Sequence, residues 1–212
     1  MALIAIVIPF FTMMSSIRIL FTPITLEIEY NLPNFPPDEY GFTTADRIHW
    51  GKISLQYLLQ NKPVSFLEQQ TLPNGQPLYT ERELGHMVDV QKLLQLMIKV
   101  WIGLGIFLVL AVILFWRLKW TNSLWRALST GGFITLGIIG LILVGIFAGF
   151  SAFFTDFHEL FFTGNSWLFY YSDSLIRLFP LKLWQDGFTV MGTLSGLIGL
   201  LAAVLPRRWI TN

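Results

Sequence analysis

The sequence predicts an all-α membrane protein, with four transmembrane helices and a small extracytoplasmic cap between the first and second. Three observations lead to this fold class. The 212-residue chain is 54% hydrophobic and only 13% charged, which is too apolar for an ordinary soluble domain. Four separate stretches each supply the roughly 20 mostly apolar residues that a helix needs to cross a bilayer. The acidic residues all lie outside those stretches.

The four predicted spans are justified in chain order by their length and lack of charge. They cover residues 2–23, 96–116, 127–154 and 187–206, and the last two contain no charged residue. The first stretch lacks a basic start and a clear small-x-small cleavage site, so we expect a retained anchor rather than a signal peptide. Residues 1–212 are therefore expected to form a single membrane domain.

The basic residues predict how the spans are oriented. The loop after the second span and the segment after the fourth are basic and contain no acid, with Arg117, Lys119, Arg126, Arg207 and Arg208. Such segments remain cytoplasmic, so both termini are expected in the cytoplasm. Residues 24–95 and 155–186 then face the opposite side, and they contain all 13 acids and all three histidines. Any chemistry is therefore expected on the extracytoplasmic face.

The first part of the predicted cap combines an extended segment with a helix. Residues 31–42 contain several prolines, which lack a backbone donor and disfavour helix in the residue before them. Residues 43–62 predict an amphipathic helix that Thr43 caps, with Asp46 three residues later in a variant capping box.

The second part of the predicted cap is a hairpin followed by a helix. Residues 65–80 predict a β-hairpin that turns at Asn74-Gly75, a pair suited to the positive φ angles of a tight turn. Residues 81–96 predict a helix that continues into the second span. A cap of about 70 residues is small for an independent domain, so we expect it to pack on the spans or on lipid headgroups.

Two histidines are candidates for chemistry. His86 and Asp89 are three residues apart on a predicted helix and share a face, where a carboxylate can fix the tautomer of an imidazole. His158 lies between Asp156 and Glu159 in the stretch FFTDFHELFF, just beyond the third span. Both histidines are expected near the same outer interface, although an interfacial histidine without a catalytic role remains an alternative for each.

Composition excludes several other kinds of site. The chain has no cysteine, which excludes disulfides, thiolate metal sites and a cysteine nucleophile. Two histidines and an aspartate could bind zinc, but no H-E-x-x-H or similarly compact ligand spacing is present, so we expect no metal. The net charge of +1 gives no basic surface for nucleic acid.

Arg18, near the end of the first span, either serves the function or extends its charge to the headgroups.

Three stretches resemble a known family. SSIRILFTPITLEIEYNLPNFPPDEYGFTTADRI, LPNGQPLYTERELGHMVDV and DFHELFFTGNSW are similar to the bacterial lipoprotein intramolecular transacylases, small membrane proteins that form lyso-form lipoproteins. The resemblance covers nearly the whole chain in order. Its most specific parts are the H-M-x-D-V block at His86 and the F-H-x-x-F-F block at His158.

The resemblance implies an activity, a location and a set of site residues. The reaction would move the second-position acyl chain of a diacylglyceryl-cysteine to its own α-amine, in the bacterial cytoplasmic (inner) membrane, without a cofactor. The partners would be diacylglyceryl-modified bacterial lipoproteins and membrane lipid, with no nucleic acid. His86 and His158 would be catalytic, with Asp89 orienting His86. For substrate binding we expect Arg18, Asp156, Phe157 and Trp167.

The roles of the two histidines and two other functional classes stay open at this point. Our hypothesis makes His158 the general base and His86 the acid or oxyanion stabiliser, and the sequence does not decide that order. A membrane metal-dependent hydrolase or protease could use the same histidines. A non-catalytic transport or assembly subunit is a third class, although its spans would offer almost no polar groups along a path. The oligomeric state is not predicted.

Overall fold

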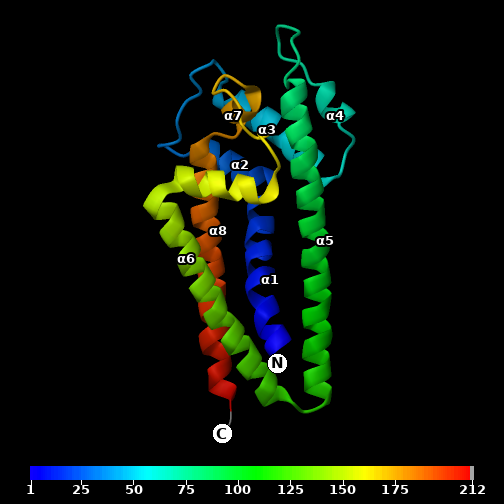
Figure 1. The fold of residues 1–212 in the computed structure, drawn as a ribbon, viewed down its shortest axis with the longest axis vertical. Coiled ribbons are helices and arrows are strands. Elements are labelled where there is room, and N and C mark those ends of the chain that lie inside the picture. The colour runs from blue at the N-terminus through cyan, green and yellow to red at the C-terminus, as the bar shows by residue number, and fades with distance from the viewer. Residues whose placement is uncertain (211–212) are drawn as a thin grey trace. The chain divides into compact units, whose positions relative to one another are not determined.

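A computed structural model describes residues 1–210 of the chain, and every regular element in that range is a helix (Figure 1). The order is α1 (Ala2–Leu20), α2 (Pro23–Tyr30), α3 (Thr44–Leu59), α4 (Ser65–Glu68), α5 (Glu81–Arg117), α6 (Thr121–Phe161), α7 (Ser174–Leu178), α8 (Leu181–Val204) and the 3₁₀ helix η1 (Leu205–Trp209). The chain forms two compact units. Unit 1 comprises Met1–Leu20, Met97–Phe150 and the chain from Gly187 on, and unit 2 comprises Phe21–Leu96 and Ser151–Asp186.

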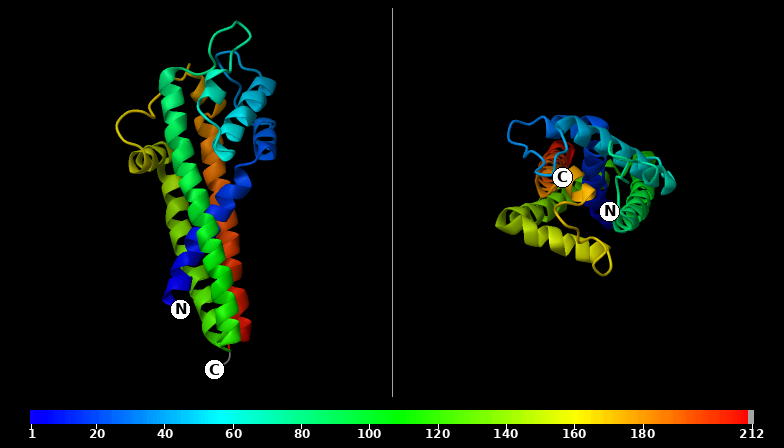
Figure 2. Two further views of the ribbon diagram at one scale, coloured as in Figure 1. Left: turned by 90° about the vertical axis from the view of Figure 1, so that its right-hand side faces the viewer. Right: turned by 90° about the horizontal axis from the view of Figure 1, so that it is seen from above.

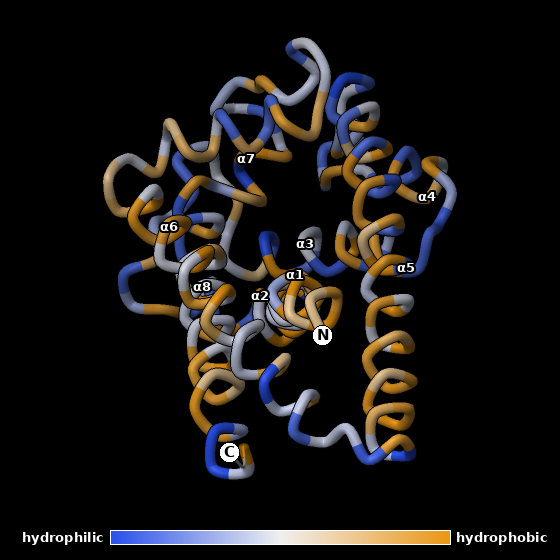
Figure 3. The backbone as a smooth tube through the Cα atoms, turned by 60° about the horizontal axis from the view of Figure 1, so that its bottom comes forward, coloured by the Kyte–Doolittle hydropathy of each residue, from blue (hydrophilic) through white to orange (hydrophobic). Residues whose placement is uncertain are grey.

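Four helices are long and apolar enough to cross a membrane, namely α1, α5, α6 and the segment Leu181–Trp209. Large apolar side chains on α5 are exposed, for example Ile106 at 57% and Val109 at 59%, and Figure 3 shows the apolar character of this helix along the tube. Such a surface is unfavourable in water and favourable in hydrocarbon. The chain is therefore a multi-pass membrane protein, as the sequence predicted.

Unit 1 is a bundle of helical segments that run side by side (Figures 1 and 2). The start of α1, the turn between α5 and α6, and η1 all lie at one end of this bundle. Helices α6 and α8 approach closely at Gly132, where an added Cβ would lie 2.3 Å from the backbone nitrogen of Ala203. Ser195 donates a hydrogen bond to Ser16 at 2.9 Å inside the bundle. Small residues thus permit close helix packing, which substitutes for a hydrophobic driving force in lipid.

Helix α6 contains a break in its backbone at Gly149, whose φ of 177° and ψ of 85° are not helical. The piece before the break belongs to unit 1, whereas the piece from Ser151 to Phe161 belongs to unit 2. The break therefore separates the apolar spanning part of the helix from the part that carries His158.

Unit 2 has a core in which α2 and α3 pack around Leu26, Tyr30 and Leu55. The hydroxyl of Tyr30 donates a hydrogen bond to the backbone oxygen of Leu178 and so joins α2 to the end of α7. The predicted start of α3 is confirmed. Thr43 and Asp46 form a reciprocal capping box: the Thr43 hydroxyl accepts from the Asp46 N–H at 3.1 Å, and the Asp46 carboxylate accepts from the Thr43 N–H at 2.8 Å.

The predicted β-hairpin at residues 65–80 was wrong. This stretch begins with the short helix α4, and its strand-like pairing is one isolated bridge between Thr71 and Pro77. Gly75 does adopt the positive φ of a turn, at 82°. The pairing does not extend because the next donors bond elsewhere: the Gln70 N–H donates to the Leu67 oxygen at 3.0 Å, and the Gln76 N–H donates to Asn74 Oδ1 at 3.1 Å.

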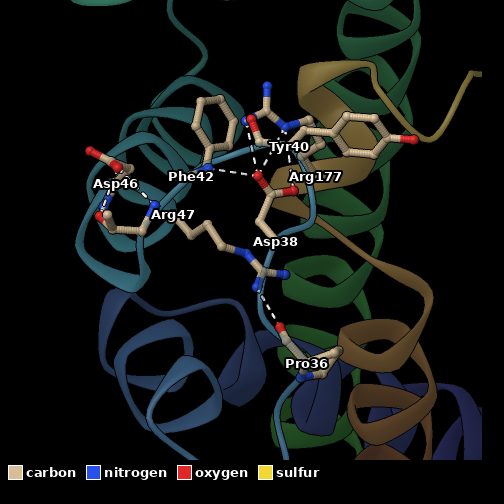
Figure 4. Close-up of polar contacts among 8 residues, drawn as sticks. Pro36, Asp38, Tyr40, Phe42, Asp46, Arg47 and Arg177 are labelled. Atoms are coloured by element: carbon tan, nitrogen blue, oxygen red, sulfur yellow. Dashed lines mark hydrogen bonds and ion pairs between the residues drawn. The ribbon is translucent and has the colours of Figure 1, made fainter.

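The proline-rich segment after α2 is fastened by two arginines (Figure 4). Arg47 is buried and donates from Nη1 to the Pro36 backbone oxygen at 2.8 Å. Arg177 of α7 pairs with Asp38 at 2.9 Å, and its guanidinium lies 3.5 Å from the centre of the Phe42 ring. The Arg177 charge and the Phe42 N–H bond hold the pKa of the Asp38 carboxyl below its usual value, against the opposing effect of burial. These contacts order a segment that has no regular structure of its own.

Candidate active site

Two histidines from distant parts of the sequence meet in unit 2. His86 lies near the start of α5 and His158 near the end of α6. Their ring centres are 6.2 Å apart, and the ring planes are inclined by 25°. Both residues are buried, with exposures of 6% and 9%. Phe162 contacts both rings, at 4.9 Å from His86 and 5.6 Å from His158 between ring centres. The two imidazoles therefore share a buried aromatic setting.

One hydrogen bond determines where the proton lies on neutral His158. Its Nδ1 is 2.8 Å from the backbone oxygen of Phe154, one turn earlier in α6. A carbonyl oxygen can only accept, so Nδ1 donates and Nε2 keeps the free lone pair. Burial lowers the pKa of His158 below its usual value, and the hydrogen bond partly opposes this change. At neutral pH His158 is thus a neutral base, and Nε2 is its basic atom.

His86 is also held neutral. Burial is the main reason that its pKa falls to about 4, followed by repulsion from a charge on His158, with Asp89 acting in the opposite direction. His86 and His158 both lie outside the apolar stretches 96–116 and 127–154. The Nδ1 atom of His86 is buried, and the described part of the chain offers it no hydrogen-bond partner. Because buried polar atoms in proteins are nearly always paired, this nitrogen is suited to a partner that a ligand supplies.

Glu83 fixes the start of α5 one turn before His86. The residue is 1% exposed, and its Oε2 accepts from the Thr80 N–H at 2.7 Å and from the Thr80 hydroxyl at 2.9 Å. The other carboxylate oxygen accepts from the backbone N–H of Leu175, at the start of α7, at 2.6 Å. Our sequence reasoning missed this residue. The T-x-x-E spacing of Thr80 and Glu83 is a capping-box signature and could have found it.

The segment between α6 and α7 closes over His86 through an aromatic contact. Phe169 presents its ring to His86 with 5.4 Å between ring centres and an interplanar angle of 61°. Arg82 holds this segment from α5, since its Nη2 donates to the Asn165 backbone oxygen at 2.9 Å. The Arg82 guanidinium also lies 5.4 Å from the centre of the Phe169 ring. Arg82 and Glu83, neighbours on α5, therefore both tie this helix to the chain that follows α6.

Comparison with known proteins identifies the family. The sequence matches the family model described as lipoprotein intramolecular transacylase Lit over residues 2–184. The chain belongs to the Lit family. An uncharacterized protein from Aquifex aeolicus (strain VF5) is 31% identical over 219 residues, which cover 98% of this chain and 94% of that protein. The resemblance seen in the sequence is thereby confirmed.

Two solved Lit structures share the fold. The in meso structure of the membrane-integral Lit from Bacillus cereus aligns with a TM-score of 0.78 at 18% identity, over 98% of this chain and 92% of that one. A second structure, of the Bacillus cereus protein with one histidine replaced by arginine, aligns with a TM-score of 0.68 at 18% identity, over 98% and 91%. The all-helical membrane architecture is thus the Lit architecture, and the chain is a member of an acyltransferase family that acts on lipoproteins.

Some of the other predicted site residues of this Lit chain lie beside the histidines. Phe157 contacts His158 edge to face, with 5.5 Å between ring centres. Trp167, in the segment after α6, lies 4.9 Å from His158 between ring centres, with ring planes inclined by 34°. These two side chains extend the aromatic surroundings of the imidazole pair.

The remaining predicted residues lie elsewhere. Asp156 is exposed, because it occupies a different face of α6 from buried His158. The carboxylate of Asp89 accepts from Lys92 at 3.4 Å, and within residues 1–210 no hydrogen bond joins it to His86. Arg18 belongs to the last turn of α1 in unit 1. Across the part of the chain that the structure describes, no three His, Cys, Asp or Glu side chains gather in an arrangement that could hold a metal ion.

Proposed function

We propose that this Lit-family chain catalyses intramolecular acyl transfer on bacterial lipoproteins by histidine acid–base chemistry. The observation that carries the proposal is a buried pair of neutral imidazoles, in which the His158 Nδ1 bond to Phe154 leaves Nε2 as a base. The substrate is a lipoprotein whose N-terminal cysteine bears a diacylglyceryl group and a free α-amine. The acyl chain at the second glycerol position moves to that amine and gives the lyso form.

The reaction needs one proton to move from nitrogen to oxygen. The amine nitrogen attacks the ester carbonyl carbon, a C–N bond forms, and the C–O bond to glycerol breaks. The amine loses one proton and the glycerol oxygen gains one, so atoms and charge balance without a cofactor. An α-amine has a pKa of about 8 and is largely protonated at neutral pH, so it first releases that proton to solvent, and the neutral NH₂ form attacks. In our proposal, Nε2 of His158 takes the amine proton during the attack and delivers it to the departing glycerol oxygen.

His86 serves this scheme best as a hydrogen-bond donor. With a pKa of about 4 it is not an imidazolium at neutral pH, so it does not supply a full proton. A positive charge on His158 keeps His86 neutral. A neutral imidazole can still donate one N–H to the oxygen on which negative charge develops. We therefore assign the proton transfers to His158, and we assign to His86 a hydrogen bond that stabilises the negative oxygen of the intermediate.

The aromatic residues around the pair serve to hold the reacting groups and to keep water away. Phe157 and Trp167 are assigned to the acyl ester, because their rings border His158. Excluding water protects the ester from hydrolysis and strengthens each polar interaction. Asp89 influences His86 through its charge alone, and we assign the exposed Asp156 and the Arg18 guanidinium to the polar lipid head or peptide of the substrate.

We also propose the orientation that the basic residues predict. The start of α1, the α5–α6 turn and η1 lie at one end of unit 1. This end carries Arg117, Lys119, Arg207 and Arg208, so by the positive-inside rule it faces the cytoplasm. The chain is then a single membrane domain of the bacterial inner membrane with both termini inside. Residues 24–95 and 155–186, which contain both catalytic histidines, face outward.

The proposal is tested by mass spectrometry of lipoprotein N-termini from cells with and without the protein. We expect one acyl chain to move from glycerol to nitrogen at unchanged total mass. Replacing His158 with Ala should lower the rate by about 10²–10⁴-fold, the usual contribution of a general base, which leaves no detectable product in cells. His86→Ala should likewise leave no detectable product. His49→Ala is the matched control, since His49 is exposed and its ring packs against Trp50, away from the imidazole pair in sequence.

Two results would contradict the proposal. The first is unchanged lipoprotein fragments from cells that accumulate the folded protein in their membranes. The second is full activity of His158→Ala, which would remove that residue from the mechanism. Release of free fatty acid, with a loss of activity in chelator that zinc restores, would instead indicate the metal-dependent hydrolase class.

A further inference from the structure

A hydrogen-bond donor without an acceptor lies beside the imidazole pair. The Nε1 atom of Trp167 is buried and has no hydrogen-bond partner among the residues that the structure describes. Its ring centre is 4.9 Å from that of His158, and ring atoms of the two side chains are therefore in contact. An indole N–H can only donate, so it needs an acceptor atom. Buried donors are paired in the great majority of cases, and this one finds no acceptor within residues 1–210.

Another tryptophan of the same unit shows how the protein satisfies an indole when the role is structural. Trp184 packs on Phe154, with 6.1 Å between ring centres, and thus borders the same aromatic group as His158. Its Nε1 donates to the backbone oxygen of Phe179 at 3.1 Å. The Trp184 N–H thus has a backbone acceptor, whereas the Trp167 N–H has none within residues 1–210.

The segment that carries Trp167 is held in place from α5. Arg82 donates to the backbone oxygen of Asn165, two residues before Trp167, at 2.9 Å. Phe169, two residues after it, packs against His86 and under the Arg82 guanidinium. The chain is thus tied to α5, the helix that carries His86, on both sides of Trp167, at Asn165 and at Phe169. A donor held in this way is preorganised for an acceptor that arrives with a ligand.

We infer that the Trp167 N–H donates to the carbonyl oxygen of the ester under attack and stabilises the negative charge that develops there. This inference rests on the proposed acyl transfer and adds a catalytic residue to it. The tetrahedral intermediate places an anionic oxygen within a buried aromatic site. That oxygen needs hydrogen-bond donors that are already in position when the charge develops. Trp167 is neutral at every pH, so it does not compete with His158 for the amine proton. The unpaired Nδ1 of His86 is the second polar atom available to the same oxygen.

The test compares Trp167→Phe with Trp184→Phe in the full-length purified protein. The substrate is a synthetic diacylglyceryl-cysteine lipopeptide in detergent micelles, and kcat, KM and thermal unfolding are measured for both variants. Trp167→Phe removes the N–H and keeps an aromatic ring, so kcat should fall by about 10²-fold, the usual effect of losing one oxyanion donor. KM should change little, because the charge exists only in the transition state. Thermal stability should be unchanged or higher, since an unpaired donor is lost.

Trp184→Phe is expected to give the opposite pattern. It leaves the Phe179 oxygen without its donor, so the unfolding temperature should fall while kcat stays within about threefold of wild type. A Trp167→Phe variant with wild-type kcat, or one that loses activity only in proportion to lost folded protein, overturns the inference alone. A wild-type protein that shows no isomerisation overturns the proposed function and the inference together.

Discussion

The carboxylate of Glu83 should be among the most sensitive side chains in unit 2, and Glu83→Gln tests this. The carboxylate accepts from two groups of Thr80 through one oxygen and from the Leu175 N–H through the other. A glutamine has one oxygen and one NH₂, so one of these two sets of donors must face another donor. A hydrogen bond to a charged group contributes about 1.5–3 kcal/mol, and an unsatisfied buried donor costs about 1–3 kcal/mol. We therefore expect Glu83→Gln to lower the free energy of unfolding by about 2–3 kcal/mol.

This loss can be measured as a shift in unfolding temperature. For a chain of this size, each kcal/mol corresponds to about 2–4 °C, so the expected shift is about 4–12 °C. Intrinsic tryptophan fluorescence in detergent, at one scan rate, gives the apparent midpoint. Glu81→Gln is the matched control, because Glu81 lies in the same first turn and is exposed. If both variants unfold within 2 °C of each other, the assigned role of Glu83 is wrong.

Three further predictions concern pH, helix packing and the arginine contacts. The rate kcat/KM should rise with pH below about 6.5, because burial lowers the pKa of His158 and only its neutral form accepts a proton; it should continue to rise toward about pH 8 as the amine deprotonates. A rate that falls across this range would contradict the assignment of His158 as base. Gly132→Ala should reduce the yield of folded protein, since its Cβ would meet the Ala203 backbone at 2.3 Å, whereas Gly140→Ala, with nothing within 4 Å, should not; size-exclusion chromatography compares the two. Arg177→Lys should speed proteolysis of the proline-rich segment, because a lysine loses the fork of hydrogen bonds to Asp38; equal cleavage rates would count against this role.

Stability should also depend on pH through His86. Its pKa is about 4 in the folded protein and about 6.5 in an unfolded chain, so the unfolded state binds more protons between these values. Stability is therefore fully present above pH 6.5 and is lost as the pH falls toward 4, by up to about 3 kcal/mol. His86→Gln should remove most of this dependence in a thermal unfolding series. If His86→Gln loses stability with falling pH as the wild type does, titratable groups other than His86 cause the loss.

The sequence predicts well those features that depend on neighbouring residues. The α3 capping box at Thr43 and Asp46 was predicted from spacing and is confirmed, because a capping box involves only local hydrogen bonds. The hairpin prediction relied on Asn74-Gly75, and the turn does form. It failed as a hairpin because the Gln70 N–H, which would continue the ladder, donates to the Leu67 oxygen at the end of α4, a contact that the turn signal alone does not reveal.

Features that depend on tertiary contact were less accessible. The sequence placed His86 and His158 at one depth, but only the fold determines that their rings lie 6.2 Å apart. Asp156 lies two residues before His158 in the sequence. On a helix this spacing places the two side chains on different faces, and Asp156 is exposed. The partner of Glu83, the Leu175 N–H, lies 92 residues away, and no local pattern indicates such a contact.

The mutual influence of the two imidazoles has a consequence for bioenergetics. Because a charge on either ring disfavours a charge on the other, the pair accommodates at most one mobile proton during turnover. A centre of that kind returns to the glycerol oxygen the proton that it takes from nitrogen, so the two imidazoles gain and lose no net proton in a turnover. Acyl transfer by this pair should therefore run at the same rate whether the membrane is energised or fully uncoupled.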